Sequence, residues 1–419
     1  PELSYALSPL LLCSKCTRDK GFKYAITKRS KCRELSRDEV AKKVNECQAA
    51  GRKYLDDAFL PSEAALWNDP DKPGDPHYIT YPSTWRRLSD LFETMPNPRV
   101  FIDGAEGADV EQGGIGTCYL LGCVAVLATN QEYIEKVFIK PWNVDVGIYS
   151  LMFSHNKLWK YVIIDDYVPC LESTQGADPW ENPLPVYAWS ADRNEMYVML
   201  IEKAYAKFKG SYEAIDGGVD RYAMVDLTGG VCEALKFDDP KISRSLKTGA
   251  FWETMVLYKA QNKLMSCYIE DLSAANEEPT EQGLLKGHAY AITGVCVVGA
   301  NRLLQIRNPH GSTTWSGAWH DLKQEVVGGD VVDDGQFYMS YNDFIKGFTA
   351  VDVTTLLPDS DDVALPGASP GSRAHDAGGL DVEDLDTLEL AVKALSGAVE
   401  NLPLLRRATQ RRRWGAVSQ

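Results

Sequence analysis

A cysteine that follows a glycine-rich turn opens a long apolar run. Gly113, Gly114 and Gly116 precede Cys118, and residues 119–128 are almost entirely apolar. This pattern predicts a helix that begins at the cysteine, where unpaired backbone N–H groups and the positive end of the helix dipole favour the thiolate over the thiol. Cys118 is therefore a candidate nucleophile. The structural alternative is a buried cysteine that packs as a small hydrophobic side chain.

A candidate base for this sulfur lies far downstream. His288 opens an alternating, β-branched stretch that ends at Val298, and after a short turn the stretch 302–307 leads to Asn308. These two stretches predict a hairpin that brings Asn308 back beside His288. In such a set the imidazole accepts the thiol proton, the amide oxygen fixes the ring tautomer, and the imidazolium later protonates a leaving amine.

Gln112 lies shortly before Cys118 in the same glycine-rich segment. Its side-chain amide could join the Cys118 backbone N–H as an oxyanion donor, worth about 3 to 4 kcal/mol per donor in comparable enzymes. Each residue of the set also has an ordinary explanation: a histidine at a strand start is often a packed or surface residue, and Asn before Pro is a common turn signal. Their joint occurrence, each in a local context that suits its role, indicates thiol catalysis.

The segments around these residues resemble the protease core of the calpains, a family of papain-like, calcium-dependent cysteine proteases. The resemblance rests on the nucleophile, histidine and asparagine segments and on further motifs around them, in the ranges 112–121, 287–290, 306–311, 45–61, 202–218, 228–230 and 334–344. It implies an α+β, papain-like fold with two lobes. A helical lobe would carry the nucleophile, and a barrel-like β-sheet lobe would carry the histidine and asparagine.

The resemblance also describes the substrate cleft. Gly218 and Gly287 match positions where the family's backbone hydrogen-bonds an extended substrate, a role that suits glycine because the peptide must approach closely. Three residues depart from the pattern: Tyr119 and His310 replace tryptophans, and Thr117 replaces an acidic residue. The imidazole of His310 is smaller than the indole that shields the triad in the family, and it titrates near neutral pH. The loss of an acidic group at position 117 modestly favours the thiolate.

Two calcium sites are implied by the resemblance. In the first, the backbone carbonyls of Ile102 and Gly104 and the carboxylates of Asp109 and Glu195 match ligand positions. Hard oxygen ligands of this kind suit calcium. Without the family match, the two acids would be interpreted as ordinary solvated side chains. We predict one good calcium site here.

The second implied calcium site has lost part of its ligand set. Asp321 and Asp334 match carboxylate ligands and Val332 could supply a carbonyl, whereas Thr314 and Gln336 stand where further carboxylates are expected. Because ligand charge sets calcium affinity, the loss of two negative charges weakens the site. We predict that it binds calcium poorly or not at all.

Composition excludes several function classes. The 419 residues carry a formal net charge of −15, which argues against nonspecific nucleic-acid binding. No apolar run approaches the roughly 20 residues that span a bilayer. Ten cysteines without the spacing of a secreted disulfide scaffold predict a reduced, cytoplasmic protein. A less favoured interpretation is a four-thiolate zinc site formed by Cys13, Cys16, Cys32 and Cys47.

Shifts in composition divide the chain into four parts. These are a basic N-terminal extension over 1–39, the protease core over 40–352 with a boundary near 220 between the Cys lobe and the His/Asn lobe, a flexible linker over 353–381, and an amphipathic helix with a basic tail over 382–419.

Two helices are predicted near the ends of the core. Ser36 and Glu39 form a capping signal for a helix that runs towards Ala50. Near the C-terminus, apolar residues at spacings of 3 and 4 form one helical stripe, which could dock on a partner or remain a marginal, isolated helix. The basic tail after it could contact an acidic partner or anionic lipid, which allows peripheral membrane contact.

Together these features predict a calcium-dependent intracellular cysteine endopeptidase that makes limited cuts in protein substrates by a Cys–His–Asn mechanism. A second hypothesis is a non-catalytic, calpain-like scaffold or regulatory module that binds partners through its cleft or tail. A third is a transglutaminase, which also uses a papain-like thiol and calcium. Transglutaminases normally orient the histidine with aspartate, whereas Asn308 occupies that place here.

Overall fold

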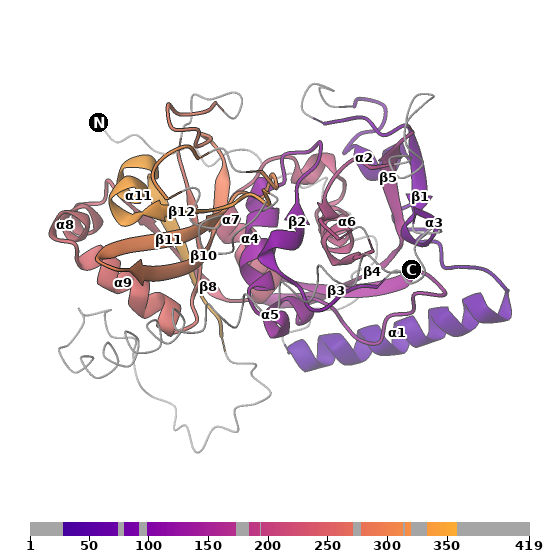
Figure 1. Cartoon of the computed structure of the whole chain (residues 1–419). Coiled ribbons are helices and arrows are strands. Elements are labelled where there is room, and N and C mark those ends of the chain that lie inside the picture. The colour runs from indigo at the N-terminus through magenta and orange to yellow at the C-terminus, as the bar shows by residue number, and fades with distance from the viewer. Residues whose placement is uncertain are drawn as a thin grey trace, which may run out of the picture.

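The protein has two lobes (Figure 1). Each lobe has a large hydrophobic core of its own. The computed structural model describes residues 28–357, except for 74–78, 92–98, 173–183, 193, 271–277, 313–314 and 320–332. One lobe combines helices with short sheets, and the other is built on a single antiparallel sheet. The predicted α+β class is confirmed.

The first lobe surrounds helix α4, whose 11 residues are all buried. A helix that is apolar on every face has to be covered on every face. The helices of this lobe are α1 (Arg29–Ala49), α2 (Glu63–Leu66), α3 (Leu88–Leu91), α4 (Cys118–Ala128), α5 (Gln131–Glu135), α6 (Tyr197–Lys209) and α7 (Asp220–Thr228). Its strands are β1 (Thr84–Arg87), β2 (Val110–Glu111), β3 (Ile148–His155), β4 (Leu158–Asp165), β5 (Tyr167–Leu171), β6 (Leu184–Pro185) and β7 (Trp189–Ser190).

The second lobe contains an antiparallel sheet with the strand order β12-β11-β10-β9-β13-β8. Its strands are β8 (Val231–Lys236), β9 (Leu264–Tyr268), β10 (Ala289–Val298), β11 (Asn301–Arg307), β12 (Gln336–Ser340) and β13 (Ala350–Thr355). Its helices are α8 (Pro240–Thr248), α9 (Ala250–Ala260) and α11 (Tyr341–Gly347). Phe251 and Trp252 of α9 belong to the core that covers the sheet.

Helix α1 packs against β3 and β4 and is longer than predicted. It begins at Arg29 rather than at Ser36, so the predicted capping signal is wrong. Ser36 lies inside the helix, where its Oγ is buried 2.6 Å from the Oγ of Ser150 on β3. Arg29, Cys32 and Ser36 form a buried face, and such tertiary packing stabilises helical turns that local signals do not predict. The predicted boundary at 39/40 therefore falls inside α1.

Cys32 and Cys47 lie on the same helix, in different hydrophobic clusters. Their positions on α1 differ by 15 residues, which at 1.5 Å per residue is about 22 Å. The two thiols cannot ligate one ion, so the four-thiolate zinc interpretation is wrong for this pair. Cys13 and Cys16 lie outside the described residues.

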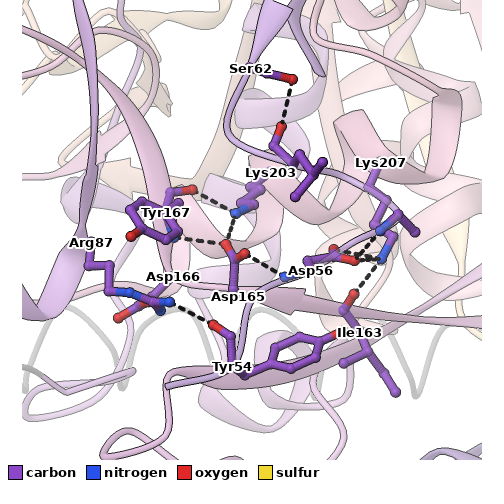
Figure 2. Close-up of polar contacts among 12 residues, drawn as sticks. Tyr54, Asp56, Ser62, Arg87, Ile163, Asp165, Asp166, Tyr167, Lys203 and Lys207 are labelled. Carbon is purple, nitrogen blue, oxygen red and sulfur yellow. Dashed lines mark hydrogen bonds and ion pairs between the residues drawn. The ribbon is translucent and has the colours of Figure 1, made fainter. Parts of the chain in front are cut away.

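A buried network of ion pairs holds the first lobe together (Figure 2). The pairs are Lys203–Asp165, Lys207–Asp56 and Arg87–Asp166. Lys203 of α6 also donates to the carbonyl oxygen of Tyr167 at 2.6 Å. The Lys203 and Asp165 side chains are 1% and 0% exposed. Because a buried charge is costly unless it is paired, this network fixes α6 against the end of β4.

Contacts across the interface join the two lobes. Helix α4 packs against β9 and β10 of the second lobe. Figure 1 shows α4 beside β10. Arg307 at the end of β11 is buried and reaches back to the first lobe, where it donates to the carbonyl oxygens of Gly107, Ala108 and Val110. The bonds to Ala108 and Val110 measure 3.1 and 2.5 Å. The strand that leads to Asn308 is thereby attached to the segment that leads to Cys118.

Two carboxyl groups also meet in the interior of this interface. Asp220 opens α7, Asp352 lies on β13, and both are buried. Ser266 donates to Asp220 at 2.6 Å, but neither carboxylate oxygen of Asp352 has a hydrogen-bond partner of normal geometry within the described residues. Burial raises the pKa of Asp352 to about 8; the Asp220 carboxyl adds to this shift and Arg221 opposes it.

We predict that Asp352→Asn weakens the pH dependence of stability. The carboxyl has a pKa of about 4 in the unfolded chain and about 8 in the folded one. Between these values the folded state holds the extra proton, so stability falls as pH rises, by up to about 1.4 kcal/mol per pH unit. Asparagine has no such proton. Free energies of unfolding from about pH 5 to pH 8 check this; equal slopes for the variant and the unmodified chain would contradict it.

The ends of the described structure bear on the predicted domains. Strand β13 runs to Thr355, so residues 353–355, predicted as linker, are strand. The remainder of the linker, the amphipathic helix and the basic tail, over 358–419, lie outside the described residues, as do residues 1–27. The predicted boundary near 220 falls at the start of α7, which packs against β3 of one lobe and β13 of the other. In the part of the chain that the structure describes, no helix is long and apolar enough to cross a membrane.

Candidate active site

Cys118 is the first residue of α4, as the sequence predicts. Thr117 occupies the N-cap position, and the cysteine is nearly buried, with 9% of its surface exposed. The preceding turn is fixed through Gly116, whose N–H donates to Asp216 Oδ1 and whose carbonyl accepts from Gly217 N, both at 2.8 Å. The sulfur therefore stands on a rigid helix N-terminus, where the dipole stabilises negative charge.

The histidine and asparagine come together as the hairpin prediction requires. Strand β10 begins one residue after His288, β11 ends one residue before Asn308, and the two strands pair antiparallel. Nε2 of His288 lies 2.8 Å from Oδ1 of Asn308, and both residues are buried. Because an amide oxygen only accepts hydrogen bonds, this contact assigns the proton to Nε2 and makes Nδ1 the basic nitrogen.

Further contacts orient this pair. Asn308 Nδ2 donates to the carbonyl oxygen of Ser312 and Oδ1 accepts from His310 N, both at 3.0 Å. The ring of His310 lies against that of His288, with centroids 4.3 Å apart, and Tyr290 meets His288 edge-on at 4.8 Å. His310 thus adjoins the histidine on a side that a tryptophan would cover more fully.

Packing between the lobes brings the two halves of the site together. Helix α4 lies along β10: a Cβ on Gly122, one turn after Cys118, would be 3.8 Å from the carbonyl oxygen of Ala289. Ala289 directly follows His288. The start of α4 and the start of β10 are therefore neighbours, which places the cysteine and the histidine at the same end of the interface.

Gln112 also adjoins the site. Its backbone N–H donates to the carbonyl oxygen of Pro309 at 2.9 Å, which ties the nucleophile segment to the residue after Asn308. Its side-chain Nε2 donates to the carbonyl oxygen of Ile115 at 2.9 Å, while Oε1 is buried without a hydrogen-bond partner among the described residues. One hydrogen of Nε2 is already used, and the oxyanion role of this amide stays a prediction.

The two predicted substrate-binding glycines differ in their surroundings. A Cβ on Gly218 would come within 2.4 Å of the Tyr119 ring, whose hydroxyl donates to the carbonyl oxygen of Ile215 at 3.2 Å. Packing against Tyr119 therefore requires a glycine there. Gly287 has a φ of +66°, which favours glycine, and its N–H donates to the carbonyl oxygen of Ile269 at 2.9 Å. Their contacts with substrate stay predictions.

Of the predicted carboxylate ligands of the first calcium site, Glu195 is buried and Asp109 is partly buried, and the Asp109 charge acts on Glu195. Glu195 Oε1 accepts from Ile102 N at 2.9 Å and Oε2 accepts from the Ser190 hydroxyl at 2.7 Å. Asp109 Oδ2 accepts from Glu106 N at 2.6 Å. Burial raises the pKa of Glu195 to about 8, with the Asp109 charge adding to the shift, and burial raises the pKa of Asp109 to about 6.

This donor set fits a calcium ion. A divalent cation would offset the cost of removing the Glu195 carboxylate, and in part that of Asp109, from water, and backbone carbonyls are suitable further ligands. Gly104, a predicted carbonyl ligand, lies in the same loop with a φ of +99°. Across the described ranges, no cluster of three or more His, Cys, Asp or Glu side chains could hold a metal. An ion here would therefore depend on the backbone oxygens of Ile102 and Gly104, as the prediction requires.

The second predicted calcium site is mostly outside the described residues, which do not include Asp321, Val332 or Thr314. Asp334 is described, and its Oδ1 accepts from Gln336 N at 3.1 Å. The expectation of a weak or absent site stays a prediction.

The sequence patterns did not single out two buried charged residues beside the site. Glu202 on α6 accepts a hydrogen bond from Thr117, the residue before Cys118, and Arg307 directly precedes Asn308. In the sequence, Glu202 and Arg307 could have been identified as charged residues at core positions of otherwise apolar stretches. Charged side chains are rarely fully buried without a specific partner.

Most of the chain is similar to known proteins. Residues 54–355 match the family described as "Calpain family cysteine protease". The chain is 33% identical over 341 residues to "Calpain-type cysteine protease DEK1" of Zea mays, covering 78% of this chain and 15% of that protein. It is 32% identical over 333 residues to Calpain-9 of Homo sapiens and 32% identical over 340 residues to Calpain-8 of Rattus norvegicus, each match covering 75% of this chain and 44% of the relative. The chain thus spans less than half the length of these relatives.

Proposed function

Because this chain belongs to the calpain family of cysteine proteases, we propose that it is a calcium-dependent cysteine endopeptidase that makes limited cuts in protein substrates. The proposal rests chiefly on the 2.8 Å contact between His288 Nε2 and Asn308 Oδ1, which leaves Nδ1 as the base. This pair lies where β10 adjoins the start of α4, the helix that begins with Cys118.

The proposed reaction has two halves. Nδ1 of His288 takes the thiol proton of Cys118, the sulfur bonds to the scissile carbonyl carbon, and the carbonyl oxygen gains negative charge. The backbone N–H of Cys118 and the amide of Gln112 support that oxyanion. The imidazolium then protonates the leaving amine as the C–N bond breaks. Water, deprotonated by Nδ1, attacks the thioester, which releases the acid product and restores the thiol.

Calcium would be held by the carboxylates of Asp109 and Glu195 with the backbone oxygens of Ile102 and Gly104. Bound there, it would supply positive charge that stabilises the two carboxylates and orders their loop. Support for a regulatory effect comes from Arg307 of the second lobe, which bonds to carbonyl oxygens of the same loop. The order of this loop therefore bears on the alignment of the two lobes.

Cys118→Ala is expected to abolish cleavage of fluorescein-labelled casein while changing the melting temperature little, since the substitution removes only the sulfur of a small side chain that is 9% exposed. The unmodified chain should cleave casein in the presence of calcium and stop when a chelator is added. Cys296→Ala, at a partly exposed cysteine elsewhere on β10, is the matched control and should keep its activity. Cleavage by the Cys118→Ala variant would refute the assignment.

A non-catalytic scaffold is the second candidate, favoured by the replacement of a shielding tryptophan by His310 beside the histidine. Alkylation of Cys118 by iodoacetamide separates the two candidates. A chain that neither cleaves casein nor becomes labelled when calcium is added would support the scaffold. Calcium-dependent labelling together with casein cleavage would support the peptidase.

Protein substrates, an intracellular location and a partner for the C-terminal segment are further parts of the proposal. The intracellular location is supported by eight cysteines of the described residues whose thiols are free, since such thiols suit a reducing compartment. The basic C-terminal tail supports an acidic partner or an anionic membrane surface as its target.

A further inference from the structure

Glu202 contacts the turn that precedes Cys118 and has no role in the reaction proposed above. It belongs to α6 and is 2% exposed. Its Oε1 accepts a hydrogen bond from the Thr117 hydroxyl at 2.7 Å, and its Oε2 accepts one from Ala188 N at 2.9 Å. Both carboxylate oxygens are therefore occupied, and one of their donors belongs to the residue before the nucleophile.

The backbone N–H, the carbonyl and the hydroxyl of Thr117 all make hydrogen bonds. Its N–H donates to the carbonyl oxygen of Ile115 at 2.8 Å, and its carbonyl accepts from Leu120 N and Leu121 N at 2.9 Å. An N-cap threonine usually uses its side chain to accept from the helix N–H groups. Here the Thr117 hydroxyl accepts no hydrogen bond from the helix and instead donates one to Glu202.

The orientation of Thr117 determines that of the proposed oxyanion donor. The peptide unit between Thr117 and Cys118 is planar and trans, so the Cys118 N–H points opposite to the Thr117 carbonyl. Fixing the threonine therefore fixes the direction of this N–H. A donor aimed at the position of the developing oxyanion gives the largest rate effect when it is held before the reaction begins.

We propose that Glu202 is a positioning residue for the oxyanion site, which acts by holding the Thr117 hydroxyl and thereby the peptide plane that carries the Cys118 N–H. This inference rests on the proposed function, because it concerns a donor of that reaction. It also gives a chemical reason for threonine at position 117: a hydroxyl donates to the buried carboxylate, whereas an aliphatic side chain leaves one oxygen without a partner.

The charge state of Glu202 agrees with this role. Burial raises its pKa to about 7, and the hydrogen bonds from Thr117 and Ala188 oppose that shift. The two donors therefore favour the carboxylate form, which accepts at both oxygens.

Thr117→Val tests the proposal because valine keeps the shape of threonine and removes the donor. In the presence of calcium, kcat for labelled casein should fall about tenfold or more with KM little changed. Thr117→Ser restores a hydroxyl and should restore most of kcat. The rate at which iodoacetamide alkylates Cys118 should stay near that of the unmodified chain, because the sulfur and its base are untouched.

Glu202→Gln is a second variant, which keeps the proposal testable if the valine variant unfolds. Its amide oxygen can face only one of the two donors: with the oxygen towards Ala188 N, the Thr117 hydroxyl has to accept from the amide instead of donating, which reorients it. We therefore expect kcat to fall, by less than in Thr117→Val, while the alkylation rate holds. An unchanged kcat in folded Thr117→Val or Glu202→Gln, or a parallel loss of kcat and alkylation, overturns the proposal. If the unmodified chain itself does not cleave casein, the proposed function fails and this inference fails with it. An active chain with unaffected variants refutes only the positioning role.

Discussion

Asn308→Ala is expected to lower kcat for casein cleavage by at least about 100-fold, because His288 loses the acceptor that holds its Nε2 proton. Without that amide oxygen the buried ring can rotate or take the tautomer with the proton on Nδ1, which cannot accept the thiol proton. Steady-state kinetics in the presence of calcium, with a melting curve for each protein, check the prediction.

Asn301→Ala is the matched control for this experiment. Asn301 lies at the other end of the same strand, is exposed, and bonds only weakly through Nδ2 to the carbonyl oxygen of Val298 at 3.4 Å. Its replacement should leave kcat near that of the unmodified chain. Equal kcat values for Asn308→Ala and Asn301→Ala would show that the amide does not orient the histidine.

Lys203→Met should lower the free energy of unfolding by about 3 to 5 kcal/mol, because it removes one member of a fully buried ion pair. Methionine fills a similar volume, so the loss reports mainly on the charge left behind. Asp165 keeps two backbone donors, Asp56 N at 2.8 Å and Tyr167 N at 2.9 Å, which places the expected effect towards the lower end of this range. Urea unfolding followed by circular dichroism measures it.

Lys236→Met controls for the loss of a lysine as such. Lys236 pairs with Glu270 at 2.9 Å, but the two side chains are 43% and 40% exposed. Exposed ion pairs contribute about 0 to 1 kcal/mol, so this variant should be close to the unmodified chain in stability. A loss of similar size in both variants would mean that the buried network does not stabilise the first lobe.

The first experiment tests the contact between His288 and Asn308, and the second tests the ion pairs that hold α6 in place. The ion network fixes α6 within the first lobe, and α6 in turn carries Glu202 to the nucleophile turn. Arg307 and Gln112 then connect that lobe to the strand and loop that hold Asn308. The arrangement of the proposed catalytic residues thus depends on residues that have no role in the proposed reaction steps.

Local patterns in the sequence were sufficient for the central features of the site. A glycine-rich turn before an apolar run predicted that a helix begins at Cys118, and two alternating stretches predicted the hairpin that pairs His288 with Asn308. Both predictions depend on contacts between residues near one another in the chain, where turn chemistry and periodicity act directly. The same motifs indicated the calpain family, which the comparisons confirm.

The tertiary structure decided which residues are buried by contacts with segments that are distant in the sequence. Helix α1 begins at Arg29 because its first turns pack on β3 and β4, and no local capping signal contains that contact. The hydrogen-bond partners of Glu202 and Arg307 belong to distant segments of the chain. In the sequence, each of these two residues is therefore only a charged residue that interrupts an apolar pattern, and its partner cannot be identified. A polar group is buried only where the fold supplies its hydrogen bonds. The sequence by itself therefore determined which residues could perform the chemistry, while the folded chain decided which other residues hold them in place.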